Sequence, residues 1–522
     1  MLGVYPSFEH PASLTGSTLY GILNKMILIK NSLVVDGTGK PPAQADILIK
    51  DDRISVIGNV PAQAAPLVIN GQGLIAAPGF IDINTDSDHY LSLFTDPAQQ
   101  DFLLQGVTTI IGGHCGSSLA PLIKGTLESI RKWADINQIS VNWNTVAEFF
   151  KTLEQLKIGV NFGMLAGHST IRRALIGDAH RDLTVGELNI VKHSIQAALR
   201  DGVLGVSTGL GYSHGKAASF MELKQVIELV AKAGGIYSTH LRSERADVVN
   251  AVSETLEIAR VTGVKTLISH FRPIIGFTEE YEQARALLER ASGIDIHFDL
   301  YPFDYSIIPI YTLLPEWAQE GSLEQMVERL KEPQFAAEII KSLRIAAANE
   351  LVIARAPGMD YLVGKSIAAF SDNRAEKIEK SILYLMQATK LRALLFHNNI
   401  DLALTQAALL SPKVFVASNS PSLLETRNVL ENERAKKTFS TFLALAGAQG
   451  KKLEWAIEKI TNAPATFLKL KDRGTLREGA YADVVLFHPK ESGARYVFIN
   501  GKPAVIDGRL ESTRSGVILR RV

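Results

Sequence analysis

The feature that most constrains the fold is a regular alternation in the middle of the chain. Short β-branched runs there are separated by segments of helical period or by turn-rich segments. Eight such runs occur: "APGFIDIN", "GVTTIIGG", "IGVNFGMLAG", "VLGVSTG", "GGIYSTHL", "VKTLISHF", "IDIHFDLYP" and "VFVASNS". Because strand, helix, strand at this spacing favours parallel βα units, the alternation predicts an α/β fold with a TIM-like (β/α)8 barrel. A doubly wound parallel sheet is the alternative that periodicity alone leaves open.

The helical segments carry their own start and stop signals. Thr184 with Glu187, and Ser219 with Glu222, have the spacing of a capping box ahead of amphipathic stretches. Gly234-Gly235 follows the second stretch, where a helix is expected to end. These signals support helices between the predicted strands.

Both ends of the chain are rich in short strands with tight turns, as in "MILIKNSLVVDGTG", "YADVVLFHP", "ARYVFINGKPAVIDG" and "GVILRR". We therefore expect one small β-sandwich domain built from residues 26–75 and 466–522, with the barrel between them at 76–465. The runs "ELVIARAP" and "RALLFHN" exceed the eight strands and are assigned to an insertion around residues 305–400. Residues 1–25 show no period and are interpreted as an N-terminal extension.

Composition narrows the class of partner and the compartment. In 522 residues, Lys and Arg total 55 and Asp and Glu total 54, so no net field favours nucleic acid or an anionic membrane. No apolar run approaches the length of a membrane span, and Glu9 and His10 interrupt any signal-peptide core. The single cysteine, Cys115, excludes an intrachain disulfide. We expect a cytoplasmic protein, a monomer or small homo-oligomer, that acts on a small molecule.

Polar side chains stand where the predicted strands end, and in such a barrel those ends carry the chemistry. Five of the eight runs end in them: Asn84-Thr85-Asp86, His114-Cys115, His240, His270 and Asn419. One thiolate and two imidazoles from separate strands would form a three-ligand site with an open position, as catalytic zinc requires. Taken singly, each residue has an ordinary reading as a buried cysteine or a hydrogen-bonded histidine.

Several blocks in the same order resemble the N-acyl-D-amino-acid deacylases, or D-aminoacylases, of the amidohydrolase superfamily. They are "GQGLIAAPGFIDINTDSD", "GVTTIIGGHCGSSLAPL", "GHSTIRRALIG", "GVSTGLGYSHGKAASFMELKQVIELVAKAGGIYSTHLRSE", "ISHFR", "DLYPF" and "NAPATFLKLKDRGTLREGAYADVVLF". The resemblance implies a distorted (β/α)8 barrel with a β-sandwich. It also implies zinc on Cys115, His240 and His270, and hydrolysis of a non-peptide C–N amide bond in an N-acylated amino acid.

The sequence departs from this family at a second, weaker metal position. Where the family has His-x-His on the first strand, this chain has Asn84-Thr85-Asp86, and where it has Ser-Asp-Gly on the eighth, this chain has Ser418-Asn419-Ser420. Residues 421–439 contain no recognisable His-Pro-Arg loop. We therefore expect one zinc ion and a degenerate second site at Asn84, Asp86 and Asn419.

The loss of the family's catalytic aspartate, at position 419, leaves the base to be supplied elsewhere. An asparagine cannot accept a proton from water as a carboxylate does. Asp86 is the best-placed substitute, because in a closed barrel its strand borders the eighth. His89 and His114 are further candidates. Asp86 and Asp88 have an equally ordinary interpretation as loop or helix-cap residues.

On the substrate side, Arg272 stands where the family commonly has a lysine that faces the substrate carboxylate, and a guanidinium binds a carboxylate bidentately. Tyr212 and Tyr301 match family tyrosines that line the pocket, although packing at the barrel mouth explains them as well.

The sequence thus predicts a zinc amidohydrolase of reduced activity. One alternative is an inactive homologue that serves as a binding or regulatory protein. A second alternative is a cyclic amidohydrolase such as a dihydroorotase or hydantoinase, whose metal-binding patterns are not found here.

Overall fold

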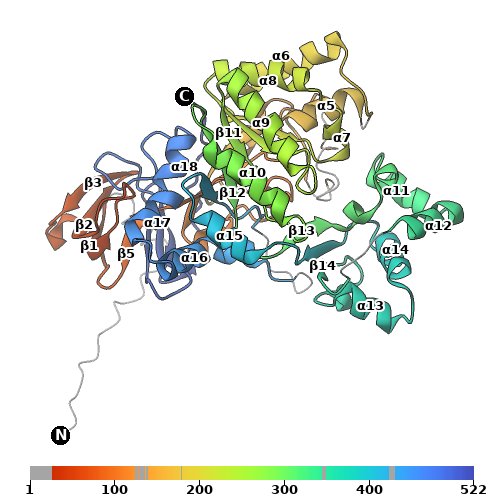
Figure 1. Ribbon diagram of the computed structural model, residues 1–522. Helices are drawn as coiled ribbons and strands as arrows, with labels where there is room; N and C mark the ends of the chain where they lie inside the picture. The colour runs from red at the N-terminus through yellow and green to blue at the C-terminus, as the bar shows by residue number, and fades with distance from the viewer. Residues whose placement is uncertain are drawn as a thin grey trace, which may run out of the picture.

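The computed structural model describes residues 26–521 apart from 124–126, 128–135, 137–138, 178, 344–347 and 423–429. The predicted extension at residues 1–25 lies outside the described residues. Figure 1 shows a central barrel with a sheet domain on one side and a helical insertion on the other. Within the described part of the chain, no helix is both long enough and apolar enough to cross a bilayer.

The barrel has eight parallel strands in the order β16-β12-β11-β10-β9-β8-β7-β6. They are β6 (Phe80–Asp82), β7 (Val107–Gly112), β8 (Asn161–Gly167), β9 (Gly205–Gly209), β10 (Ile236–His240), β11 (Lys265–Ile268), β12 (Ile296–Leu300) and β16 (Val414–Val416). The gap between β6 and β16 is bridged beyond the strand ends, where the backbone N–H of Asn419 donates to the Asn84 carbonyl at 2.9 Å. The predicted (β/α)8 fold class is confirmed, and the doubly wound alternative is wrong.

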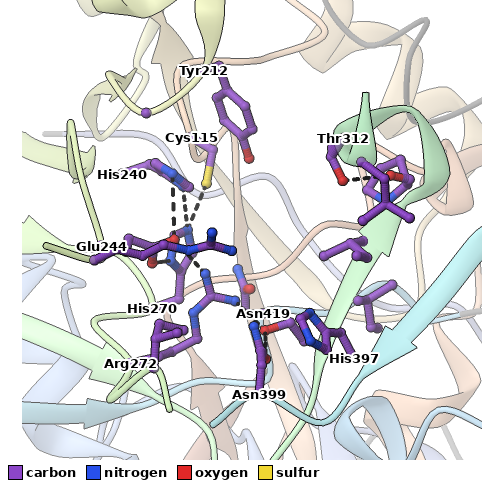
Figure 2. Close-up of a pocket in the computed structure, with 18 of the residues that line it drawn as sticks. Cys115, Tyr212, His240, Glu244, His270, Arg272, Thr312, His397, Asn399 and Asn419 are labelled. Carbon is purple, nitrogen blue, oxygen red and sulfur yellow. Dashed lines mark hydrogen bonds and ion pairs between the residues drawn. The ribbon is translucent and has the colours of Figure 1, made fainter. Parts of the chain in front are cut away.

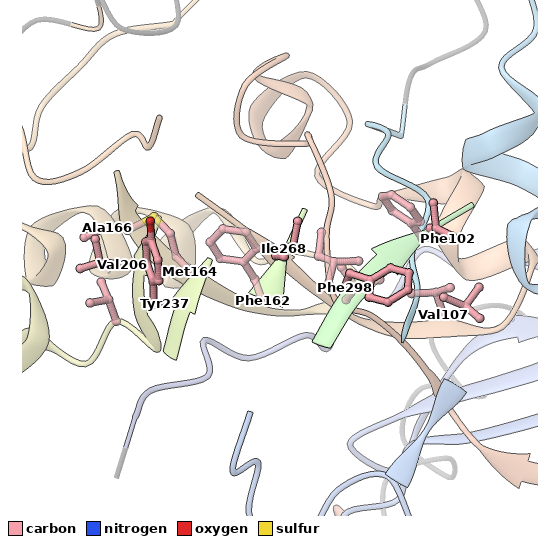
Figure 3. Packing of buried hydrophobic residues seen from close by; sticks show 14 of the residues in the cluster. Phe102, Val107, Phe162, Met164, Ala166, Val206, Tyr237, Ile268 and Phe298 are labelled. Atoms are coloured by element: carbon pink, nitrogen blue, oxygen red, sulfur yellow. The ribbon is translucent and has the colours of Figure 1, made fainter. Parts of the chain in front are cut away.

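Side chains along the strands alternate between two cores, as barrel geometry requires. Ile110 and Met164 point outward into the large cluster beneath the helices, whereas Ile111 and Leu165 belong to a separate cluster that fills the barrel. Figure 3 shows part of the outer cluster, with Phe162 and Met164 packed among neighbouring strands and helices.

The outer layer consists of short and long helices that follow the strands. They are α2 (Ser92–Thr95), α3 (Gln100–Leu104), α4 (Val146–Leu156), α5 (His168–Ile176), α6 (Val185–Asp201), α7 (Ser213–Lys216), α8 (Phe220–Lys232), α9 (Val248–Thr262), α10 (Thr278–Arg290), α15 (Leu402–Leu409), α16 (Glu433–Ala448), α17 (Leu453–Ile460) and α18 (Asn462–Phe467).

One of the two predicted capping boxes is complete. Thr184 and Glu187 cap α6 reciprocally. Ser219 accepts from the Glu222 backbone at the start of α8, but the Glu222 carboxylate instead binds His168 at 2.8 Å and Arg172 at 3.0 Å. The histidine of the "GHSTIRR" block therefore belongs to a buried structural network.

Both ends of the chain contribute to one nine-stranded sheet in the order β20-β19-β18-β17-β5-β1-β2-β3, with β4 paired to β1. Its strands are β1 (Met26–Val34), β2 (Ala43–Lys50), β3 (Arg53–Gly58), β4 (Leu67–Asn70), β5 (Ile75–Pro78), β17 (Val484–Phe487), β18 (Ala494–Ile499), β19 (Lys502–Ile506) and β20 (Arg509–Leu510). Only Gly79 separates β5 of this sheet from β6 of the barrel.

The expected strand in "GVILRR" does not join that sheet. Instead, Phe162 at the start of β8 donates to the Val517 carbonyl at 2.9 Å and accepts from Leu519 at 2.8 Å, so residues 516–521 run beside the barrel. At the amino end of β8, the backbone groups of Phe162 are not paired with β9, and the tail pairs with them. The outer position of the terminal sheet is taken by β20.

Between β12 and β16, the described residues form a body made of a three-stranded sheet and the four α-helices α11 to α14, which share an apolar core of their own. The strands are β13 (Ser306–Pro309), β14 (Leu351–Arg355) and β15 (Leu394–His397), and the helices are α11 (Leu323–Leu330), α12 (Pro333–Ser342), α13 (Ile367–Asn373) and α14 (Ile378–Ala388). The two extra apolar runs of the sequence form β14 and β15 in this body. It lies at the carboxyl ends of the barrel strands and therefore contributes to the site.

Candidate functional site

The carboxyl ends of β7, β10 and β11 bring together Cys115, His240 and His270 (Figure 2). Their ligand atoms all lie within 4.8 Å of one another. His270 Nε2 is 3.3 Å from Cys115 Sγ and 3.0 Å from His240 Nδ1. The three residues singled out at separate strand ends thus form one cluster.

The backbone at these strand ends is unusual. Cys115, His270 and Asn419 have φ values of 53°, 40° and 47°, in the left-handed region that non-glycine residues rarely adopt. Such conformations cost roughly 1–3 kcal/mol each and concentrate at functional sites. Packing around the barrel mouth therefore holds these side chains in position at a cost to stability.

Glu244, which sequence reasoning left without a role, fixes the tautomer of His270. The carboxylate lies 3.0 Å from His270 Nδ1, so Nδ1 carries the proton and donates it to Glu244. Nε2 is then the nitrogen that faces Cys115 and His240, with a lone pair available for a metal ion. A carboxylate behind a histidine ligand is the usual orienting arrangement in metal sites.

The protonation states of Cys115 and His240 explain why this cluster suits a cation. Burial raises the pKa of the Cys115 thiol, and the nearby carboxylates of Asp86, Asp299 and Glu244 raise it further. Burial lowers the pKa of His240 to about 3, so its imidazole is neutral and able to coordinate. A divalent ion reverses the preference of a buried thiol and stabilises the thiolate. One thiolate with two imidazoles is a donor set that suits zinc.

Arg272 lies beside the cluster and is held by three groups. It forms an ion pair with Glu244 at 2.6 Å, and it donates to Ser306 Oγ at 3.0 Å and to the Tyr301 hydroxyl at 3.4 Å. Tyr301 is buried beneath this guanidinium and does not line the cavity. Tyr212 does line it, with its ring 4.7 Å from that of His240.

At the degenerate second metal site expected from the sequence, the side-chain amides of Asn84 and Asn419 are hydrogen-bonded to each other. Asn84 Nδ2 donates to both carboxylate oxygens of Asp299, at 3.2 and 3.1 Å. Asn84 Oδ1 accepts from Asn419 Nδ2 at 3.4 Å. Asp299 also accepts from the His270 backbone at 2.9 Å. The two asparagines therefore link β6 to β16 and, through Asp299, to the His270 turn.

Asp86 lines the cavity, whereas His114 does not. Asp86 Oδ1 lies 3.2 Å from Nδ1 of the buried His89. His114 turns into the barrel interior, with Nδ1 3.1 Å from Ser238 Oγ. Of the sequence candidates for a base, only Asp86 and His89 therefore reach the cavity.

A second arginine, which the sequence did not single out, enters from the start of α16. Arg434 lies 3.9 Å above the Tyr301 ring. Its guanidinium donates to the Ser418 carbonyl and to Asn419 Oδ1, each at 3.0 Å. Among the residues that the structure describes, no carboxylate lies within ion-pair distance of it. The segment 421–439, which lacks a recognisable His-Pro-Arg loop, thus still supplies an arginine to the site.

The cluster opens onto a cavity of about 920 Å³. In Figure 2 the candidate ligands and Arg272 occupy one side, while Thr312 and His397 from the insertion lie on the other. Apolar side chains of the insertion and of the loop after β11 complete the wall: Ile274, Ile275, Phe277, Ile307, Ile308 and Leu313.

Comparison with known proteins gives one consistent picture. No family model matches the chain. It is 26% identical over 520 residues to D-aminoacylase from Alcaligenes xylosoxydans xylosoxydans, covering 95% of this chain and 97% of that one. It is 27% identical over 523 residues to N-acyl-D-glutamate deacylase from the same organism, covering 95% and 96%.

A solved structure agrees with these relatives. The N-acyl-D-glutamate deacylase of Bordetella bronchiseptica, complexed with zinc and a phosphonate inhibitor, matches with a TM-score of 0.80 and 25% identity, over 95% of this chain and all of that one. These comparisons favour neither a binding protein nor a cyclic amidohydrolase. By sequence and by fold, the chain is a homologue of D-aminoacylase and of N-acyl-D-glutamate deacylase, and its structural neighbours include a D-aminoacylase that defines a subset of the amidohydrolases.

Proposed function

We propose that this protein is a mononuclear zinc amidohydrolase that cleaves the amide bond of an N-acylated amino acid. The observation that carries the proposal is the convergence of Cys115, His240 and His270 on a cavity that Arg272 and Arg434 also line. These three residues would hold a zinc ion, which would supply polarisation of an amide carbonyl and a lower pKa for water. Asn84 and Asn419, as neutral amides bound to each other, favour one ion over two.

The two arginines differ in what they can offer a substrate carboxylate. Arg272 is already neutralised by Glu244 at 2.6 Å. Arg434 binds neutral oxygens of Ser418 and Asn419 and pairs with no carboxylate in the described part of the chain, so its charge is available to an incoming anion. We assign Arg434 as the main residue that binds the substrate carboxylate, with Arg272 as a second contributor. The sequence predicts Arg272 alone for this role. Tyr212 would pack against the substrate beside His240, and Tyr301 would support both arginines from below.

Asp86 is proposed as the proton acceptor. The nearby positive charges of His89 and Arg434 outweigh burial and lower its pKa, so its carboxylate is ionised at neutral pH. Asp86 takes a proton from water as the water oxygen bonds to the amide carbon. It then delivers that proton to the nitrogen as the C–N bond breaks, which yields a carboxylic acid and an amine.

The proposal is tested by metal analysis and a substrate panel. Protein purified without chelator should contain about one zinc per chain, and Cys115→Ala should contain much less. N-acyl-D-amino acids, their L-enantiomers and cyclic amides are then assayed at high protein concentration. Turnover abolished by His270→Ala is the expected result. A folded, zinc-loaded protein without turnover on any of these substrates would overturn the proposal.

The same panel identifies the acyl group, the side chain and the chirality of the substrate. A cytoplasmic location and a monomeric or small homo-oligomeric state stay predictions from the sequence.

A further inference from the structure

The turn after β6 gives its two aspartates different tasks. The Asp86 backbone N–H donates to the Ser420 carbonyl at 3.1 Å, which ties the turn to the end of β16. Asp88 uses its carboxylate to accept from the Gly113 backbone at 2.7 Å, as a structural loop residue does. Asp86 instead directs its carboxylate to His89 and the cavity. The interpretation as a structural loop residue therefore applies to Asp88 and not to Asp86.

His89 faces an oxygen atom at each ring nitrogen. Nδ1 lies 3.2 Å from Asp86 Oδ1, and Nε2 lies 3.0 Å from the Ser117 carbonyl oxygen. A carbonyl and an ionised carboxylate can only accept hydrogen bonds, so both nitrogens must donate. A neutral imidazole, which has one donor, would leave a lone pair facing an oxygen at a site only 1% exposed. With Asp86 ionised, this geometry therefore calls for the imidazolium.

The charged groups around His89 agree with this protonation state. Asp86 and Asp88 lie on its own turn, with Asp88 Oδ2 3.9 Å from Nε2. Arg434 from α16 also lowers the pKa of Asp86, and His270 from the end of β11 lies within electrostatic range of that carboxylate. Burial alone lowers the pKa of His89, but Asp88 and Asp86 outweigh it and raise the value to about 9.

We infer that His89 is a positioning residue which, as an imidazolium, orients Asp86 and keeps it ionised, so that the two residues form one acid–base unit. The inference rests on the proposed hydrolase function and deepens it. Oδ1 of Asp86 is held by His89, which leaves Oδ2 for the water proton. The pair would supply at the end of β6 the base that Asn419 cannot supply at the end of β16.

A double-mutant cycle separates this role from simple structural support. Asp86→Asn should lower kcat/KM by on the order of 100-fold or more, as loss of a general base does. His89→Asn should lower it as well, with the acid limb of the pH profile displaced upward by about 1–3 pH units, because a neighbouring positive charge lowers a carboxyl pKa by that amount. Adding His89→Asn to Asp86→Asn should change kcat/KM by less than about twofold, since the residues act as one unit.

His297→Asn is the matched control. His297 also lies beside a carboxylate, with Nε2 3.3 Å from Asp295 Oδ1, but it does not line the cavity. This variant should leave kcat/KM and the pH profile unchanged, and zinc content should be the same in all variants. If His89→Asn lowers kcat/KM as much in the Asp86→Asn background as in the wild type, the inference is wrong while the hydrolase proposal stands.

A second measurement does not depend on activity. In protein labelled with ¹⁵N-histidine, with His89→Asn used for assignment, both ring nitrogens of His89 should show shifts of protonated nitrogen at pH 7.5. A neutral His89 would refute the inference. If the wild type shows no turnover on any substrate, the proposed function fails on its own, and this spectrum still decides the state of His89.

Discussion

At the residue scale, Glu244 couples the candidate metal ligands to the candidate substrate-binding arginine. One carboxylate oxygen accepts from His270 Nδ1 at 3.0 Å and the other pairs with Arg272 at 2.6 Å. Burial alone would raise the pKa of Glu244, but Arg272 and His270 hold it well below the usual range. The carboxylate therefore stays ionised at neutral pH and holds the His270 ring with Nε2 toward Cys115 and His240.

Glu244→Gln tests this coupling. The amide oxygen can still accept from His270 Nδ1, but the negative charge is lost, so zinc affinity should fall by about 10- to 100-fold, as for other groups behind metal ligands. Competition with a chromophoric chelator measures the affinity. Glu254→Gln is the control, because Glu254 pairs with Arg242 at 2.8 Å and does not line the site. Equal affinities for the two variants would contradict the assignment.

How far the site could be predicted depends on how each residue is placed. Cys115, His240 and His270 end apolar runs, so barrel topology alone brings them together. Glu244 follows four residues after His240 in a loop, and Arg434 begins a helix rich in charged residues. Neither position shows, without the fold, that its side chain turns toward the strand ends. Both resembled solvated charges until the structure placed them.

At the element scale, the eight barrel strands could be predicted because each is a largely buried run bounded by turn signals. "GVILRR" has the same local pattern, yet it lies against β8 rather than in the terminal sheet. A local pattern of apolar residues indicates an extended backbone, but it does not specify the strand with which that segment pairs. The pairing depends on which strand in the fold has free backbone groups at its edge. The tail thus supports the amino end of a strand whose other end faces the site.

Ile518→Ala tests the contribution of this tail. Ile518 is 8% exposed and packs into the main core, so the truncation should lower the free energy of unfolding by about 2 kcal/mol, the lower end for such a cavity. Urea denaturation measures the change. The neighbouring Val517→Ala is the control, because Val517 is 41% exposed and should cost less than about 0.5 kcal/mol. Equal losses for the two variants would show that the tail is not packed as described.

At the scale of the whole molecule, one buried polar network joins the sheet domain to the barrel. Asp483 pairs with Arg473 and accepts from Asn161 at the start of β8 at 2.9 Å. Asn500 accepts from Arg473 at 2.8 Å and donates to Asn161 at 2.9 Å. The C-terminal part of the terminal sheet is thereby fixed to the strand whose amino end the tail also covers. We therefore expect the network to contribute to the free energy of unfolding of both domains.

Asp483→Asn tests the junction. The substitution keeps the shape of the side chain but leaves the Arg473 guanidinium buried without its counter-ion, so the free energy of unfolding should fall by about 3–5 kcal/mol. Because Asn161 lies in the barrel, the loss should appear in one transition that includes both domains, followed by circular dichroism and by tryptophan fluorescence in urea.

Asp507→Asn is the matched control. Its partner Arg495 lies 3.5 Å away, and the two side chains are 59% and 50% exposed, so the control should lose less than about 1 kcal/mol. An early, separate transition of the sheet domain in Asp483→Asn, with the barrel unaffected, would show that the network stabilises only the sheet.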